Sequence, residues 1–189
     1  MGPPMFRYFL VTGLAIVALA SSADAGRACG FEDPNSATMQ RVKLNLIYPN
    51  SLYVQGAVDE ALREGVLLPT HFTRPGDFFA LQRTTSNLRQ FAVLVDDAAS
   101  DLPQFSMVLM GPVLWTRFHP TVEGITVENH VAGPLPDDLV VVMDVPALAA
   151  LVSGDVSGAY ANETGLVRYY GNPAEIEILR ETLAAKFTR

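Results

Sequence analysis

The segment from Leu139 to Met143 constrains the fold of this chain more than any other part of it. It reads Leu-Val-Val-Val-Met, and consecutive branched apolar residues favour a strand that is covered on both faces. Asp144 follows as a helix cap, with Pro146 in the first turn, where a missing amide hydrogen costs little. The sequence therefore predicts a layered fold with this strand inside a sheet.

Four further strand-like runs accompany this segment. Three precede it, at Phe105–Met110, Val113–Phe118 and Val122–Val131, and their short connections predict an antiparallel meander. Two short helices, ending at Gly154 and Gly165, separate the segment from a last run at Leu166–Tyr170. We expect an α/β (α+β) fold whose five-stranded, mainly antiparallel sheet packs against helices.

Apolar residues at helical spacing predict three longer helices. One begins at Asn50 or Ser51 and ends at Gly65, and one is capped by Asp77 and runs to about Val95. The core-facing stripe of the second comprises Phe78, Leu81, Leu88, Ala92 and Val95. The third starts at Asn172 and carries a stripe of Ile176, Leu179, Leu183 and Phe187.

Composition changes divide the chain into three parts. Residues 1–25 have a basic start, a short apolar run and a small-residue cleavage site at Ala25, which predict a signal peptide. Residues 26–66 form an arm with a loop, a short extended segment at Val42–Tyr48 and a helix. A linker rich in proline and polar residues then leads to an α/β domain at residues 77–189.

The predicted address is the periplasm or the extracellular space, after signal cleavage near Ala25; an uncleaved membrane anchor is the alternative. Cleavage removes one positive and one negative charge, Arg7 and Asp24, so the net charge stays at -7. An acidic chain repels phosphate backbones, which argues against nucleic acid as a partner.

Cys29 is the only cysteine, so no intramolecular disulfide is possible. Three interpretations stay open: an unpaired thiol, a disulfide or other attachment to a partner, and lipid modification. The residues before it, Gly26-Arg27-Ala28, make a poor lipid-attachment motif because Arg27 is charged.

The second half of the chain resembles the sterol carrier protein domain, a lipid-binding α/β fold with a five-stranded sheet. The resemblance lies in Val140–Gly154, an apolar strand followed by a leucine-rich helix, and in Thr164–Pro173, a Gly-led strand ending in Gly-Asn. It covers about residues 77–189 and implies an apolar cavity between the sheet and the helices. Residues 26–66 lie outside it, and export departs from the family's commoner intracellular setting.

Motifs for catalysis, cofactors and metals are missing from the sequence. There is no Gly-x-Ser-x-Gly elbow and no glycine-rich phosphate loop. His71, His119 and His130 are scattered over a linker, a turn and a strand end, so we expect surface or turn histidines and no metal site. We predict no cofactor and no enzyme activity, although a hydrolase whose His and carboxylate groups meet only in space is not excluded.

Two functions follow as hypotheses. The first is non-covalent binding of a lipid or other apolar small molecule, with methionines helping to fit an irregular ligand. Its expected lining comprises Phe91, Met107, Leu109, Trp115, Phe118, Met143, Leu148, Leu151 and Tyr160. The second is a non-catalytic accessory or docking protein of a cell-envelope complex, with the arm at residues 26–66 and Cys29 as the docking element.

Overall fold

The computed structural model of the chain describes residues 34–73 and 77–188. The predicted signal peptide and Cys29 lie outside the described residues.

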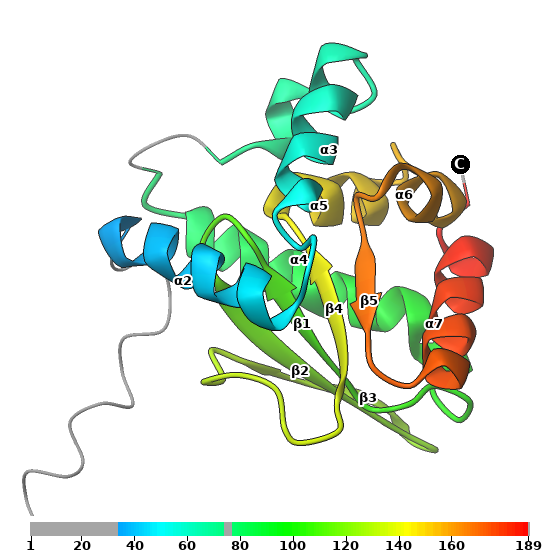
Figure 1. Cartoon of the computed structure of the whole chain (residues 1–189). Coiled ribbons are helices and arrows are strands. Elements are labelled where there is room, and N and C mark those ends of the chain that lie inside the picture. The colour runs from blue at the N-terminus through cyan, green and yellow to red at the C-terminus, as the bar shows by residue number, and fades with distance from the viewer. Residues whose placement is uncertain (1–33, 74–76, 189) are drawn as a thin grey trace, which may run out of the picture.

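A five-stranded sheet forms the centre of the molecule and confirms the predicted class (Figure 1). The strands are β1 (Phe105–Leu109), β2 (Leu114–Thr121), β3 (Gly124–Asn129), β4 (Leu139–Met143) and β5 (Arg168–Tyr170). Their order is β3-β2-β1-β4-β5. The first three form the expected meander, and the pairing of β1 with β4 is parallel while the other three pairings are antiparallel.

The two central strands are buried on both faces, as the apolar run of β4 predicted. Because side chains alternate along a strand, Met107, Leu109, Val141 and Met143 enter one apolar cluster. Val108, Met110, Val140 and Val142 enter a second cluster on the opposite face. We call these faces the inner and the outer face.

Four helices after the arm cover the inner face: α4 (Ala80–Val95), α5 (Val145–Ser153), α6 (Gly158–Thr164) and α7 (Pro173–Lys186) (Figure 1). The caps predicted at Asp144 and Asn172 are present, whereas the helix predicted to begin at Asn50 or Ser51 begins at Tyr53 and has no side-chain cap hydrogen bond. The side chains of Asp144 and Asn172 accept hydrogen bonds from Val145 N and Ala174 N. Helices α6 and α7 touch so closely that a Cβ on Gly158 would lie 2.0 Å from the carbonyl oxygen of Leu183.

The arm contacts both apolar clusters: its first helix lies on the outer face, in front of the sheet in Figure 1, and its second helix contributes Val54 to the outer cluster and Val58 and Ala61 to the inner cluster. It comprises α2 (Pro34–Ile47) and α3 (Tyr53–Arg63), and a 3₁₀ turn, η1 (Pro69–His71), follows it. The prediction of an extended segment at Val42–Tyr48 was wrong, because α2 covers most of it. Leu44 is buried and Tyr48, four residues later, packs against the outer cluster. The inward-facing residues therefore follow the spacing of a helix and not the two-residue alternation of a strand.

The start of α4 also differs from its prediction. The helix begins at Ala80, while Asp77 caps the turn before it by accepting a hydrogen bond from Phe79 N. Phe78 therefore lies outside the helix and is 90% exposed, so its assignment to the core stripe was wrong. Leu88, Ala92 and Val95 are buried as expected.

Candidate functional site

Eight of the nine residues predicted to line a cavity belong to the inner apolar layer. They are Phe91, Met107, Leu109, Phe118, Met143, Leu148 and Leu151, which are buried, and Tyr160, which is partly buried against them. Their side chains come from β1, β2, β4, α4, α5 and α6. The sheet and helices thus bring these eight residues together in one apolar layer.

The inner layer is filled by its own aromatic rings. Phe105 and Phe118 stack with centroids 4.6 Å apart. Phe91 lies 5.6 Å from Phe118 and 5.2 Å from Phe187, again centroid to centroid. Such contacts are those of a packed interior.

Trp115 is the ninth residue, and it lies on the outer face with Tyr48 of the arm. The two ring centroids are 6.2 Å apart. Tyr48 also contacts Tyr170, whose hydroxyl donates to Pro49 O at 2.8 Å. Burial raises the pKa of both phenols, and the charge of Asp138 raises that of Tyr48 further. Trp115 therefore holds the arm on the sheet.

A buried carboxylate, Asp144, ties the arm to the ends of the parallel strands. Its Oδ1 atom accepts hydrogen bonds from Gly111 N at 2.9 Å and from Val145 N at 2.7 Å. Arg41 of α2 donates to Gly111 O at 3.0 Å. A Cβ on Gly111 would lie 2.9 Å from Asp144 Oδ1, so a larger residue here would displace the carboxylate. Burial raises the pKa of Asp144 despite these hydrogen bonds.

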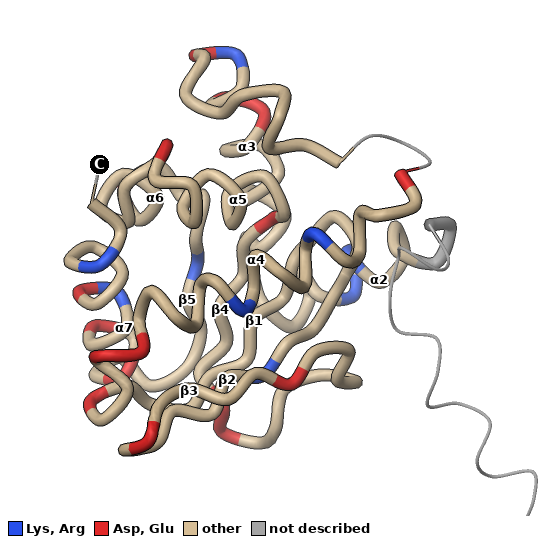
Figure 2. Tube along the Cα trace, turned by 180° about the vertical axis from the view of Figure 1, so that it is seen from behind, with Lys and Arg blue, Asp and Glu red and all other residues tan. Residues whose placement is uncertain are grey.

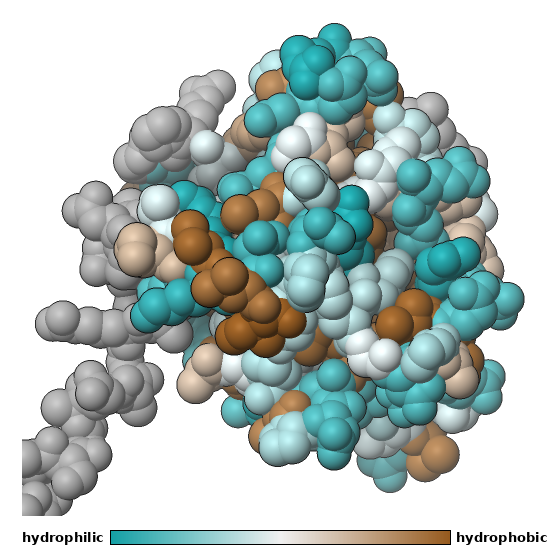
Figure 3. Space-filling view, in the orientation of Figure 1, coloured by the Kyte–Doolittle hydropathy of each residue, from teal (hydrophilic) through white to brown (hydrophobic). Residues whose placement is uncertain are grey.

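The side of α2 that faces away from the sheet is apolar as well. Met39, Val42, Leu46 and Ile47 are 62%, 47%, 78% and 66% exposed. We call these four side chains the α2 stripe; Figure 3 shows apolar surface gathered over α2. Their combined area is on the order of a few hundred Å², a size at which exposed apolar patches often mark interaction sites.

The charges beside the α2 stripe are positive in an otherwise acidic chain. Helix α2 carries Arg41 and Lys43 and no acidic residue, and Figure 2 shows its described part without acidic colour. Lys43 is exposed. Acidic residues gather elsewhere, for example on α7, with Glu175, Glu177 and Glu181.

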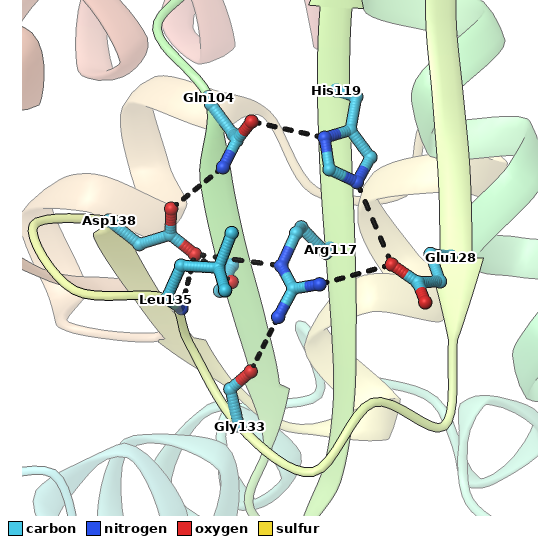
Figure 4. A network of polar contacts seen from close by, with 8 residues as sticks. Gln104, Arg117, His119, Glu128, Gly133, Leu135 and Asp138 are labelled. Carbon is cyan, nitrogen blue, oxygen red and sulfur yellow. Dashed lines mark hydrogen bonds and ion pairs between the residues drawn. The ribbon is translucent and has the colours of Figure 1, made fainter.

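The part of the outer face around Ser106 and Arg117 carries a ring of polar side chains (Figure 4). Gln104 Nε2 donates to Asp138 at 2.9 Å, and Gln104 Oε1 accepts from His119 Nδ1 at 3.0 Å. Arg117 completes the ring, with its guanidinium 3.0 Å from Glu128 and 3.7 Å from Asp138. Glu128 also lies 3.7 Å from His119 Nε2.

Asp138 is the hub of this ring. Its side chain is 3% exposed. Burial pushes its pKa upward, but hydrogen bonds from Ser106, Leu135 N and Gln104, together with the charge of Arg117, outweigh burial and lower the pKa. The Ser106 hydroxyl donates to Asp138 at 2.6 Å. The acceptor of this serine is a carboxylate with a lowered pKa and hence a weak base, which is poorly suited to activating a nucleophile. The same carboxylate holds the loop before β4 through Leu135 N.

His71 lies in the turn η1, within the expectation of a surface or turn histidine, but it is buried. Its Nδ1 atom accepts from Leu68 N at 3.0 Å, which leaves the proton on Nε2, 2.8 Å from Asp155. Ser153 donates to the same carboxylate at 2.6 Å. An imidazole and a carboxylate thus meet, but the serine bonds to the acid and not to the ring, unlike a catalytic triad.

The described residues contain neither a cluster of metal ligands nor a helix that could span a membrane. No group of three or more His, Cys, Asp or Glu side chains there is placed to hold a metal ion. None of the helices in the same part of the chain has the length and apolar character needed to cross a membrane.

Comparison of the chain with protein-family models, with curated proteins and with solved structures found no match in any of the three.

The α2 stripe is the feature that sequence reasoning missed. Its signal was present, because Met39, Val42 and Leu46 recur at spacings of three and four residues. Ala37 and Leu44 repeat on the other side of the same helix and are buried. A helix with apolar residues on both sides has a weak amphipathic pattern, and Val42–Tyr48, the end of α2 and the residue after it, was therefore interpreted as extended chain.

Proposed function

We propose that this is an exported, non-catalytic accessory protein that docks onto a protein of the cell envelope through the α2 stripe. The observation that carries the proposal is that α2 is apolar on both sides, with one side covered by the sheet and the other uncovered. A helix of this kind is normally buried on every apolar face.

The chemistry of the partner follows from the charges. An apolar groove or helix face with acidic residues at its rim would match Met39, Val42 and Leu46 flanked by Lys43. In a symmetric pair of copies the same stripe would meet itself and bring the two Lys43 side chains close together. The net charge of -7 disfavours an anionic bilayer as the partner.

Substitution of Val42 tests the proposal. Val42→Asp places a charge in the stripe, whereas Val93→Asp places one on α4, where the valine is 66% exposed. A photo-crosslinker at Leu46 in the native envelope should give one defined crosslinked protein. This product should disappear with Val42→Asp and Lys43→Glu and persist with Val93→Asp.

Three other outcomes would overturn the choice of partner. Self-crosslinking that scales with protein concentration would identify a second copy. Binding of the purified protein to vesicles with anionic lipid would identify the membrane. Crosslinking that survives Val42→Asp would remove the stripe from the interaction altogether.

A second candidate is non-covalent binding of a lipid or other apolar molecule in the inner layer. It is favoured by the gathering of Phe91, Met107, Met143 and five further predicted residues in one apolar layer between sheet and helices. Since the rings there pack on one another, a ligand would have to separate helices from the sheet. Native mass spectrometry of protein purified from its host tests this candidate, and protein that is ligand-free and takes up no fatty-acid or sterol probe would contradict it.

A further inference from the structure

A cavity of about 180 Å³ lies between η1, the first half of α4, and α5. None of the nine predicted ligand residues lines it, and it is separate from the α2 stripe. The hydrogen bond between His71 and Asp155 fixes one wall of the cavity, because it joins η1 to the residues that follow α5.

The lining combines apolar and hydroxyl-bearing side chains. Phe72, Ala80, Val145 and Ala149 supply the apolar part. Thr70, Thr73, Ser86 and Asn87 supply polar groups, and their side chains make no hydrogen bond with other residues in the described ranges 34–73 and 77–188. Hydroxyl and amide groups that converge over an apolar surface are the usual composition of a small-molecule site.

The charged groups around the cavity are already paired. Arg83 forms an ion pair with Asp77. Both ring nitrogens of His71 are engaged, one with Leu68 N and one with Asp155. A charged ligand would have to compete with these partners, whereas a neutral one would not.

The volume sets the size of the ligand. A cavity of roughly 150 Å³ accommodates benzene, and pockets for drug-sized ligands span about 300–1,000 Å³. A volume of about 180 Å³ therefore suits a compact molecule and is too small to enclose a sterol or a long acyl chain.

We propose that this cavity binds a small, neutral, hydroxyl-rich molecule of the size of a single sugar or cyclitol ring. The hydroxyls of Thr70, Thr73 and Ser86 and the amide of Asn87 bond to the ligand's hydroxyl groups. The apolar residues contact its carbon-bound face. The proposal does not depend on docking through the α2 stripe.

Titration of the isotope-labelled full chain with glucose, N-acetylglucosamine and myo-inositol, followed by nuclear magnetic resonance, tests the assignment. At least one probe should saturate with a millimolar dissociation constant and shift the amides of Asn87 and Ala149. Asn87→Ala should weaken binding roughly tenfold, the effect of losing one or two hydrogen bonds. Ala149→Leu should abolish binding by filling the cavity, and Gln82→Ala, an exposed neighbour on α4, should leave it unchanged.

Charged analogues test the neutrality of the ligand. Glucuronate and glucosamine should bind at least tenfold more weakly than glucose. Tighter binding of either ion, the same affinity in Ala149→Leu, or no saturation by any of the neutral probes would overturn the proposal. Thermal unfolding of each variant shows whether a lost signal comes from a lost fold.

Discussion

The inner and outer faces of β1 and β4 belong to the same strands but differ in what covers them. On the inner face, side chains such as Met107 and Val141 meet four helices in an apolar layer. On the outer face, Val108 and Val142 lie under α2, while Ser106 of the same strand belongs to a polar ring. The inner face is closed mainly by the α/β domain, with Val58 and Ala61 of α3 added to it, whereas the outer face depends on α2.

Because of this difference, the side chains that contribute most to folding stability are not those that are exposed for binding a partner. An apolar layer with stacked rings supplies most of the free energy of folding because it removes the largest apolar area from water. A single helix that covers half a face contributes less and leaves its own second side exposed. We therefore expect substitutions to be most damaging inside, weaker under the arm, and weakest on the α2 stripe.

Phe118→Ala should have the largest effect. Phe118 is fully buried and contacts both Phe105 and Phe91, and truncation of a buried Phe typically costs about 3–5 kcal/mol. Urea unfolding measures the loss, and Val122→Ala at a 92% exposed position is the control. A loss below about 1 kcal/mol would show that the layer relaxes easily, which would strengthen the second candidate function.

Leu44→Ala should release the arm. Leu44 is buried against the outer cluster, whereas Leu46 on the same helix is 78% exposed. We expect about 2–3 kcal/mol from Leu44→Ala, at the lower end for buried leucines, and less than about 0.5 kcal/mol from Leu46→Ala. The fluorescence of Trp115 should shift to the red before global unfolding. Equal effects of the two variants would contradict the observed orientation of α2.

Asp138→Asn should have a smaller effect that depends on pH. The pKa of Asp138 is lowered from 3.8 in the folded state, so the native state binds fewer protons than the unfolded state. Its contribution is complete above pH 3.8 and is lost as the pH falls through the lower folded pKa. The variant should lose about 1 kcal/mol at neutral pH and show a flatter decline in acid.

Asp144→Asn is the counterpart at the other end of β4. The pKa of Asp144 is raised, so its linkage has the opposite sign: its contribution is complete below pH 3.8 and falls as the pH rises through the folded pKa. Asparagine caps a helix about as well as aspartate. Denaturation over a pH series should therefore show a smaller cost at neutral pH for Asp144→Asn than for Asp138→Asn, and the reverse ranking would contradict these assignments.

The double variant Met39→Gln, Leu46→Gln should change the free energy of unfolding least, by no more than about 0.5 kcal/mol. Both side chains are more than half exposed, so little burial is lost. Urea unfolding measures this value, and the crosslinking experiment on the envelope partner, with the photo-crosslinker at Ile47 instead of Leu46, should show a loss of product with the same variant. A large destabilisation would mean that the stripe is packed in solution.

Much of the α/β domain was predictable because its signals are local. The run Leu139–Met143 matches β4 residue for residue, and the Asp144 and Asn172 caps appear where their side chains and prolines indicated. The features that were not predicted concern residues whose structure depends on partners far away in the sequence. His71 is buried because Asp155 lies beside it from 84 residues away, and α2 is helical on a surface built by later strands.

The bond from Tyr170 to Pro49 joins residues 121 positions apart, and this separation has a temporal consequence. During synthesis the arm emerges first, while the surface that receives it is completed only after β5 has been made. Loops of this length close slowly compared with local helix formation. The nascent chain thus passes through an interval in which both apolar sides of α2 are exposed. A protein that binds at this stage would contact both sides of the helix, whereas the folded molecule presents only the α2 stripe.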